Sequence, residues 1–166
     1  MKSRKSYEEE PPRGRLPPLA QVIARYGLQA NKSLGQNFLL DLNLTRKIAR
    51  SVPALKSSTI YEIGPGPGGL TRALLMEGAP FVIAVEKDRR CQAALGEVTA
   101  GYKNRLRVIE ADALKIDELK ILRGADLPVR VASNLPYNIG TALLIKWLTI
   151  EPWPAWFSSL NLMFQR

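Results

Sequence analysis

The sequence predicts an α/β fold, a doubly wound and mostly parallel sheet, and two observations support that prediction. Five short apolar runs alternate with segments of helical periodicity from residue 59 onward. Strands that alternate with helices form parallel sheets through right-handed crossovers. The first apolar run also leads into the glycine-rich stretch 64–69 and then into a helical segment, the arrangement at which such sheets bind ligands.

Residues 1–58 precede this alternation. Residues 1–18 hold four prolines among Lys, Arg and Glu, a composition typical of a flexible leader. The next segment has apolar side chains at helical spacing and should form a short helix that ends near Gly27. These side chains are Leu19, Val22, Ile23 and Tyr26.

The remaining elements follow in chain order. Residues 31–40 have no clean period, which predicts an ordered loop, and Asp41 is placed to cap a second helix that Pro53 ends. The apolar residues that share one face of this helix are Leu44, Ile48 and Val52. Strands are predicted at 59–63, 81–86, 106–110, 129–133 and 159–164. Helices are predicted at 69–77, 88–98, 115–123 and 139–148.

Composition excludes several classes of protein. Apolar residues make up 46% of the chain, enough for a packed core, but every apolar run is far too short to span a membrane. Cys91 is the one cysteine and no secretory signal is present, so a cytoplasmic location is expected. The chain has no histidine, which excludes histidine-based triads, zinc sites and general bases, and no metal site is expected.

The charge favours a polyanionic partner. Lys and Arg total 24 against 15 Asp and Glu, a net charge of +9. Residues 1–50 hold 10 basic and 4 acidic residues, so most of the excess lies in the first third of the chain. Such a balance points to RNA or DNA before a membrane, although a solvated surface without a partner accounts for it equally well.

Chemically distinctive groups follow four consecutive predicted strands. They are Gly64-Pro65-Gly66-Pro67-Gly68-Gly69, Glu86-Lys87-Asp88, Asp112-Ala113 and Asn134-Leu135-Pro136-Tyr137. Because the carboxyl ends of parallel strands meet at one edge of the sheet, these groups should line one site. Tight turns and solvated acids account for each group singly, but they account poorly for the occurrence of all four in phase.

Two cofactors compete for the first loop. The loop satisfies the dinucleotide pattern G-x-G-x-x-G, and Glu86 lies where a ribose-binding acid belongs. Pro65 and Pro67, however, have no N–H for a pyrophosphate, and Glu62 puts a negative charge where a phosphate would approach. S-adenosylmethionine, with sulfonium and ammonium groups, fits better, and an NAD-dependent oxidoreductase remains the alternative.

For S-adenosylmethionine each group has a role. The glycines of the first loop let backbone approach the methionine part of the cofactor. Glu86 is suited to accept hydrogen bonds from both ribose hydroxyls. Asp112 is suited to accept one from the exocyclic amine of the adenine, with the Ala113 backbone beside the ring.

The segment after the fourth strand predicts the reaction, although Asn and Pro are also ordinary turn residues. The amine of a planar base is a poor nucleophile because its lone pair is delocalised into the ring. Hydrogen bonds from that amine to the Asn134 side-chain oxygen and to the Leu135 carbonyl, fixed by Pro136, would localise the lone pair. Tyr137 would stack on the base and hold it in line. No histidine is needed, because the product loses its proton to solvent.

These motifs resemble the ribosomal RNA adenine-N6 dimethyltransferases, the family that includes the bacterial small-subunit enzyme of the kasugamycin-resistance type. The resemblance runs from about Ala20 to the C-terminus and rests on 32–39, 62–71, 86–88, 112–113 and 134–139. It implies a class I S-adenosylmethionine-dependent methyltransferase fold, of which residues 19–166 form the N-terminal part.

The resemblance also implies a set of site residues. Those expected to bind the cofactor are Gln36, Asn37, Leu39, Gly64, Gly66, Glu86, Lys87, Asp112, Ala113 and Asn134. Those expected at the reacting amine are Asn134, Leu135, Pro136 and Tyr137. Asn134 belongs to both sets because it would bridge the cofactor and the target.

The implied activity is dimethylation of two adjacent adenines near the 3′ end of 16S rRNA, on the small ribosomal subunit precursor, by a monomeric enzyme. Family members continue past the equivalent of residue 166, so the chain is expected to be a fragment whose fourth and fifth strands lack their usual partners. Pro65, Pro67 and Leu135 favour this enzyme over the large-subunit (23S) methyltransferases of macrolide resistance. A non-catalytic RNA-binding factor is the remaining alternative.

Overall fold

The computed structural model describes residues 16–125, 127–153 and 155–164. They form a five-stranded sheet whose neighbouring strands are all parallel, in the order β3-β2-β1-β4-β5. The strands are β1 (Thr59–Ile63), β2 (Phe81–Glu86), β3 (Leu106–Glu110), β4 (Val129–Asn134) and β5 (Ser159–Met163). The strand order reverses between β1 and β4, the point at which such sheets open a ligand crevice.

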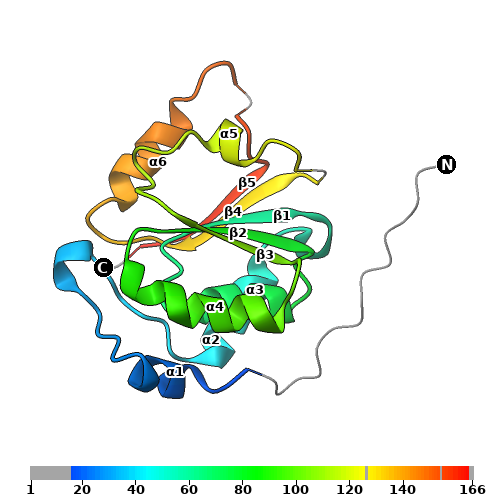
Figure 1. Ribbon diagram of the computed structural model, residues 1–166. Coiled ribbons are helices and arrows are strands. Elements are labelled where there is room, and N and C mark those ends of the chain that lie inside the picture. Colours follow the sequence, from blue (N-terminus) through cyan, green and yellow to red (C-terminus); the bar gives the residue numbers. More distant parts are fainter. Residues whose placement is uncertain (1–15, 126, 154, 165–166) are drawn as a thin grey trace.

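Helices cover both faces of this sheet and give three layers (Figure 1). The α-helices are α1 (Leu19–Arg25), α2 (Leu42–Ser51), α3 (Gly69–Met76), α4 (Gln92–Gly101), α5 (Glu118–Ile121) and α6 (Gly140–Leu148). Short 3-10 turns are η1 (Lys32–Leu34), η2 (Leu55–Ser57) and η3 (Arg89–Cys91). One core cluster joins α2, α3 and α4 to the sheet, and a second joins α5 and α6 to the opposite face. The predicted doubly wound α/β fold is therefore confirmed.

The central strands form because their side chains are apolar or β-branched and are covered on both faces. All five residues of β1 are buried, with Ile60 in one core cluster and Tyr61 in the other. Ile63 at the end of β1 lies opposite Val85 near the end of β2. This register brings the loops that follow both strands to the same edge of the sheet.

Helix α2 begins at the predicted cap, and of its predicted apolar face Ile48 and Val52 pack in the core cluster while Leu44 does not. The Asp41 Oδ1 accepts the backbone N–H groups of Asn43 at 2.8 Å and Leu44 at 3.3 Å. Leu44 is nevertheless 45% exposed, whereas Thr45 and Ala49 are buried. Thr45 tolerates burial because its hydroxyl donates to the Leu42 carbonyl at 3.1 Å.

Three other elements differ from the sequence-based expectation. The helix predicted at 88–98 starts as η3, since the Asp88 carboxylate accepts the Arg90 N–H at 3.0 Å, and continues as α4 to Gly101. Helix α5 has four residues within the predicted range 115–123. Of the two strands expected to lack their usual partners, β4 pairs on both sides, with β1 and β5, while β5 is an edge strand that pairs only with β4 among the described residues.

Residues 1–15 of the expected leader lie outside the described residues. Residues 16–18 contact the folded domain, whereas the expected leader extends to residue 18. Leu16 packs against the core cluster of α2, α3 and α4, and the Pro17 carbonyl accepts a hydrogen bond from Arg72 Nη1 at 2.8 Å. Leu16 and Pro17 are therefore in contact with the folded domain.

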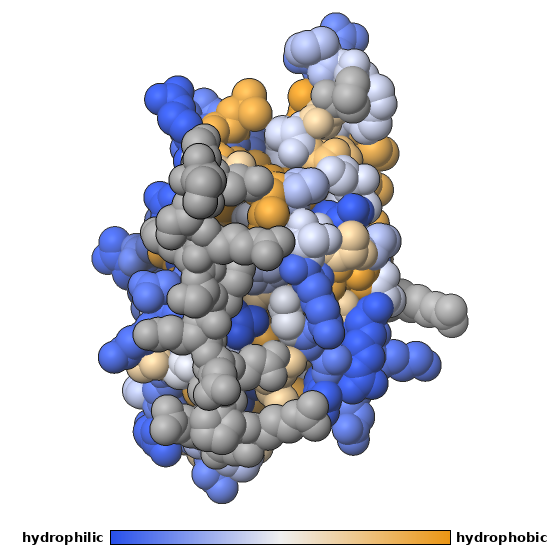
Figure 2. Space-filling model, turned by 90° about the vertical axis from the view of Figure 1, so that its right-hand side faces the viewer, coloured by the Kyte–Doolittle hydropathy of each residue, from blue (hydrophilic) through white to orange (hydrophobic). Residues whose placement is uncertain are grey.

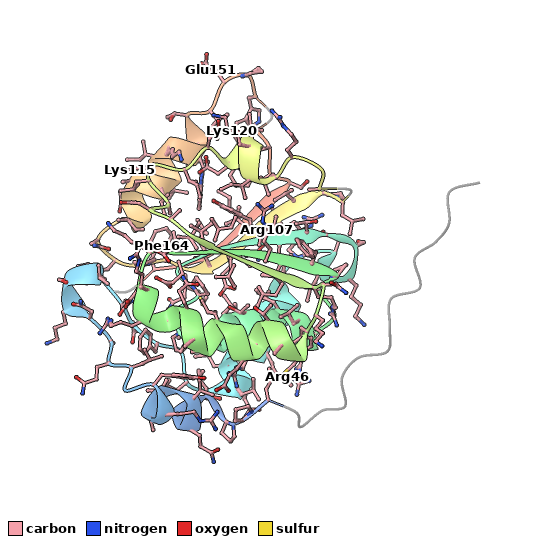
Figure 3. All side chains as sticks on the ribbon, viewed as in Figure 1. Arg46, Arg107, Lys115, Lys120, Glu151 and Phe164 are labelled. Carbon is pink, nitrogen blue, oxygen red and sulfur yellow. The ribbon has the colours of Figure 1, made fainter. Side chains whose placement is uncertain are left out.

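The surface carries basic groups on both helical layers. Lys115 and Lys120 lie in the layer of α5 and α6, and Arg46 lies in the opposite layer (Figure 3). Seen from the right of Figure 1, the molecule is largely hydrophilic in its lower part and has separate hydrophobic patches above (Figure 2). Among the described residues, no helix is long and apolar enough to cross a membrane.

Candidate functional site

A pocket opens at the carboxyl ends of the strands, beside the crossover between β1 and β4. It encloses about 1000 Å³, including its open mouth. Its wall combines the loops after four strands with a segment that precedes the sheet, residues 34–39. The loops after these four strands thus meet at one pocket, as predicted.

Eleven of the thirteen predicted site residues line this pocket. They are Gln36, Asn37, Leu39, Gly64, Gly66, Glu86, Lys87, Asp112, Ala113, Asn134 and Pro136. The other two, Leu135 and Tyr137, do not line it. The Leu135 side chain is buried in the core below α6, and Tyr137 is 59% exposed beside the pocket.

Backbone reaches the pocket at Gly64 because this residue has no side chain. Gly64 has a φ of +64°, and a Cβ placed there would lie 3.0 Å from Pro136 Cγ. The Gly64 N–H donates to the Val85 carbonyl at 2.9 Å, which ties the loop to β2. The chain after β1 therefore passes close to the segment after β4, and together they form one wall.

Glu86 is held at the floor of the pocket by backbone donors. Its Oε2 accepts the Gly66 N–H and its Oε1 accepts the Asp88 N–H, both at 2.8 Å. Burial raises the pKa of Glu86, and the two N–H groups oppose that rise. Each carboxylate oxygen has a second lone pair, so both oxygens remain able to accept a ligand's hydroxyl groups.

Asp112 sits at the mouth of the pocket in a pair with Lys87. Its Oδ2 lies 3.0 Å from Lys87 Nζ, and its Oδ1 accepts the Leu114 N–H at 3.1 Å. Lys87 holds the pKa of Asp112 below its usual value. Asp112 therefore stays ionised at neutral pH and remains an acceptor toward the pocket.

Asn134 and Gln36 connect the strand ends to the segment that precedes the sheet. The Asn134 Nδ2 donates to the Asn37 carbonyl at 2.9 Å. The Gln36 Nε2 donates to Asp88 Oδ2 at 2.8 Å, and its Oε1 accepts the Asn31 N–H at 2.9 Å. In this structure Gln36 thus bonds to protein groups as well as lining the pocket.

Glu62 is a pocket residue that the motif-based site prediction omits. It is 1% exposed at the end of β1, and its Oε2 accepts the Thr71 hydroxyl at 2.8 Å. Burial raises the pKa of Glu62 to about 8, the Thr71 hydrogen bond opposes that rise, and the charge of Glu86 adds to it. Its place two residues before Gly64 is the sequence signal, and that signal entered the choice of cofactor but not the set of predicted site residues.

Seven further apolar residues, which are not among the site residues predicted from the sequence, complete the wall of the pocket. Those that line the pocket are Leu34, Phe38, Ile63, Leu70, Val85, Leu114 and Ile139. Within the described part of the chain, no group of three or more Cys, Asp or Glu side chains is placed to hold a metal ion. The site therefore offers carboxylates, amides and backbone groups in an apolar frame.

The sequence matches a known protein family. The family model described as ribosomal RNA adenine dimethylase matches residues 27–166. The chain is 62% identical, over 151 residues, to the ribosomal RNA small subunit methyltransferase A of Azorhizobium caulinodans, and the match covers 91% of this chain and 51% of that relative. The chain spans about half the length of the curated relatives it matches.

The chain is also similar to solved structures of rRNA and adenosine methyltransferases, at lower sequence identity. The dimethyladenosine transferase from Plasmodium falciparum is 26% identical with a TM-score of 0.55, over 70% of this chain and 40% of that one. The 23S rRNA methyltransferase ErmE is 29% identical with a TM-score of 0.55, over 70% of this chain and 44% of that one. Both neighbours share the layered sheet described above.

Proposed function

The chain belongs to the ribosomal RNA adenine dimethylase family, and from that membership we propose that it transfers methyl groups from S-adenosylmethionine to adenine N6 atoms of ribosomal RNA. The observation that carries this proposal is the meeting of Glu62, Glu86, Asp112 and Asn134 in one pocket. Acids at the first three strand ends suit a cationic cofactor that carries a ribose and an adenine. The Asn134 amide at the end of the fourth strand suits the exocyclic amine of a target base.

The donor set fits S-adenosylmethionine better than a dinucleotide. Glu62 is a buried acid whose ionised form would pair with the ammonium of the methionine part, whereas a pyrophosphate would disfavour that ionised form. Gly64 leaves room for backbone to approach, since a Cβ there would crowd Pro136. Glu86 would hold the ribose and Asp112 the adenine amine. When bound, S-adenosylmethionine supplies an electrophilic methyl group on a sulfonium.

The chain's own residues would activate the accepting amine. The Asn134 Nδ2 is engaged by the Asn37 carbonyl, so the Oδ1 of the same amide is the atom placed to accept an N–H of the target amine. The Leu135 carbonyl would accept the second N–H, and Tyr137 would stack on the base. These contacts localise the lone pair on nitrogen and align it for attack. The proton that the product loses passes to solvent.

We assign the target to the small subunit. The identity of 62% to a small subunit methyltransferase, against 29% to a 23S rRNA methyltransferase, supports this choice over the large-subunit alternative. We extend the proposal to the 3′ end of 16S rRNA as the substrate region and to a monomer in the cytoplasm as the acting form. The net charge of +9 is in keeping with an RNA substrate.

A methyl-transfer assay with isotopically labelled cofactor tests the proposal. The purified protein is incubated with small-subunit rRNA or with precursor particles, and the RNA is digested and assayed for N6,N6-dimethyladenosine. We expect labelled dimethyladenosine from the wild type. We expect Asn134→Ala to lower the rate by about 100-fold or more, since it removes the acceptor at the reacting nitrogen.

Asn43→Ala is the matched control, because Asn43 is an exposed asparagine in α2 outside the pocket. It should transfer methyl groups at the wild-type rate. A wild type that binds S-adenosylmethionine but modifies neither rRNA nor particles would refute the enzymatic proposal and favour the non-catalytic alternative. A substantial rate in Asn134→Ala would refute the role given to Asn134.

A further inference from the structure

Two segments far apart in the sequence lie side by side at the pocket mouth. We call residues 31–39 the strap and residues 134–138 the clamp loop. The clamp loop donates hydrogen bonds to backbone carbonyls of the strap, which lies at the left of the view (Figure 1). The pairs are Asn134 Nδ2 to Asn37 (2.9 Å), Tyr137 N to Gly35 (3.3 Å), the Tyr137 hydroxyl to Lys32 (2.9 Å) and Asn138 Nδ2 to Ser33 (3.4 Å).

The closest approach of the two segments is at Gly35. This residue is buried and has a φ of +65°. A Cβ at this position would lie 2.6 Å from Asn138 Oδ1 and 3.0 Å from the backbone nitrogens of Tyr137 and Asn138. Any side chain here would therefore push the clamp loop away from the strap.

The strap is also anchored on its other side. Gln36 donates to Asp88 Oδ2 at 2.8 Å, and Asp88 is itself held by Arg90, whose Nη2 lies 2.6 Å from the same oxygen. These contacts fasten the strap to the segment that follows β2. The strap therefore bridges the segment after β2 and the clamp loop through hydrogen bonds to both.

The strap determines which atom of the Asn134 amide faces the pocket. A carbonyl oxygen only accepts hydrogen bonds, so the Asn37 carbonyl selects the NH₂ group of Asn134 and leaves its Oδ1 as the remaining acceptor. The Lys32 carbonyl likewise fixes the tilt of the Tyr137 ring through its hydroxyl. Loss of either contact would leave the side chain free to rotate.

We propose that Gly35 is a positioning residue for methyl transfer: it lets the strap approach closely enough for its carbonyls to orient Asn134 and Tyr137 toward the target base. The inference rests on the proposed function for its catalytic consequence. Gly35 also lines the pocket, and in this proposal it acts on methyl transfer through the two clamp-loop residues.

Gly35→Ala tests the proposal, with Gly27→Ala as the matched control. Gly27 has the same left-handed backbone, with a φ of +59°, but a Cβ there would meet nothing within 4 Å. Both variants therefore carry the backbone cost of alanine at positive φ. Only in Gly35→Ala does the added methyl group also clash with the clamp loop. Tyr137→Phe is a second variant that keeps the ring and removes the hydroxyl contact with Lys32.

Three measurements are made on each protein: amide hydrogen exchange over 134–140, S-adenosylmethionine affinity by calorimetry, and kcat for methyl transfer to rRNA. We expect Gly35→Ala to speed exchange in this peptide, because the Tyr137 N–H loses the Gly35 carbonyl. We expect its kcat to fall by about tenfold or more, with a smaller loss of cofactor affinity. Tyr137→Phe should lower kcat and leave cofactor affinity unchanged, and Gly27→Ala should match the wild type in all three.

Several results would overturn the proposal. These are unchanged exchange in Gly35→Ala, an unchanged kcat, or a loss of kcat no larger than that of Gly27→Ala. If Gly35→Ala does not fold, a wild-type kcat in Tyr137→Phe would overturn it. If the wild type transfers no methyl group, the proposed function fails, and the exchange contrast between the two alanine variants still decides whether Gly35 holds the clamp loop.

Discussion

Glu62 is the residue whose environment says most about the cofactor. A carboxylate that is 1% exposed at the end of a central strand is costly to ionise, and burial raises its pKa to about 8. At neutral pH it is therefore mostly protonated in the empty pocket. A cationic ligand would favour the ionised form, so binding of such a ligand should release a proton.

We expect the affinity for S-adenosylmethionine to rise with pH between about 7 and 9, because Glu62 must lose its proton to pair with the ammonium group. Glu62→Gln keeps an oxygen for the Thr71 hydroxyl but does not titrate, so its affinity should be weaker and less dependent on pH. Calorimetry in two buffers with different heats of ionisation measures the released proton. Equal wild-type affinity at both ends of this range, with no proton released, would contradict this role.

The same residue makes a prediction about stability. The folded pKa of Glu62 lies above its ordinary value of 4.5, so the native state keeps a proton that the unfolded chain has lost. The free energy of unfolding should therefore decrease through this residue as pH rises from about 4.5 to about 8. Urea unfolding of wild type and Glu62→Gln at pH 5 and pH 8 tests this. The free energy of unfolding of Glu62→Gln, taken relative to that of the wild type, should be higher at pH 8 than at pH 5.

At the scale of the elements, a buried carboxylate ties α5 to α6. Glu118 is 6% exposed, and its Oε1 accepts both Trp147 Nε1 at 2.9 Å and Lys146 Nζ at 2.8 Å. Trp147 is fully buried in the core cluster on that face. The four residues of α5 thus owe their position to one side chain as well as to apolar packing.

Glu118→Ala should lower the free energy of unfolding by about 3 kcal/mol, since it leaves the buried Trp147 N–H without its acceptor and leaves the Lys146 ammonium with only the Ile116 carbonyl. The matched control is Lys120→Ala in the same helix, whose pair with Asp117 is exposed on both sides. That variant should change the free energy of unfolding by less than about 1 kcal/mol. Urea unfolding decides, and equal values for the two variants would contradict the role given to Glu118.

The elements also show what the sequence could and could not predict. The predicted strands agree with the structure within a residue or so at either end, because a short apolar run between turn residues is typical of a buried strand. The predicted apolar face of α2 is right for Ile48 and Val52 and wrong for Leu44. Local spacing does not reveal that Thr45 can be buried in its place, with its hydroxyl bonded to the Leu42 carbonyl. The strap is an ordered loop, as predicted, but its hydrogen-bond partners in the clamp loop lie 97 to 105 residues away, and no local pattern encodes such contacts.

At the scale of the whole molecule, the fold and the site follow from one topological fact. The strand order reverses between β1 and β4, and the parallel strands deliver their polar ends to one crevice. The sequence therefore predicts which residues meet, from Gly64 to Asn134. It does not predict the hydrogen bonds that hold Glu86, Asp112 and Asn134. Most of these bonds are made by backbone groups, which every residue has and which no sequence pattern therefore marks, and one is made by Lys87.

The family places the chain among the ribosomal RNA adenine dimethylases, and the pocket is the part of the molecule on which the proposed activity depends. Basic side chains lie on both helical layers of the molecule (Figure 3). The proposed choice of cofactor does not depend on where an RNA would bind, since it rests on residues of the pocket, namely Glu62, Gly64, Glu86 and Asp112. It is therefore the claim to test first.

Calorimetric titration of the purified protein with S-adenosylmethionine, and separately with NAD, tests this claim most directly. We expect saturable binding of S-adenosylmethionine at one site and no measurable binding of NAD at the same concentrations. We also expect Glu86→Ala to weaken the binding of S-adenosylmethionine, because the ribose loses its acceptor. Binding of NAD with none of S-adenosylmethionine would contradict the assignment of the pocket and favour the dinucleotide alternative.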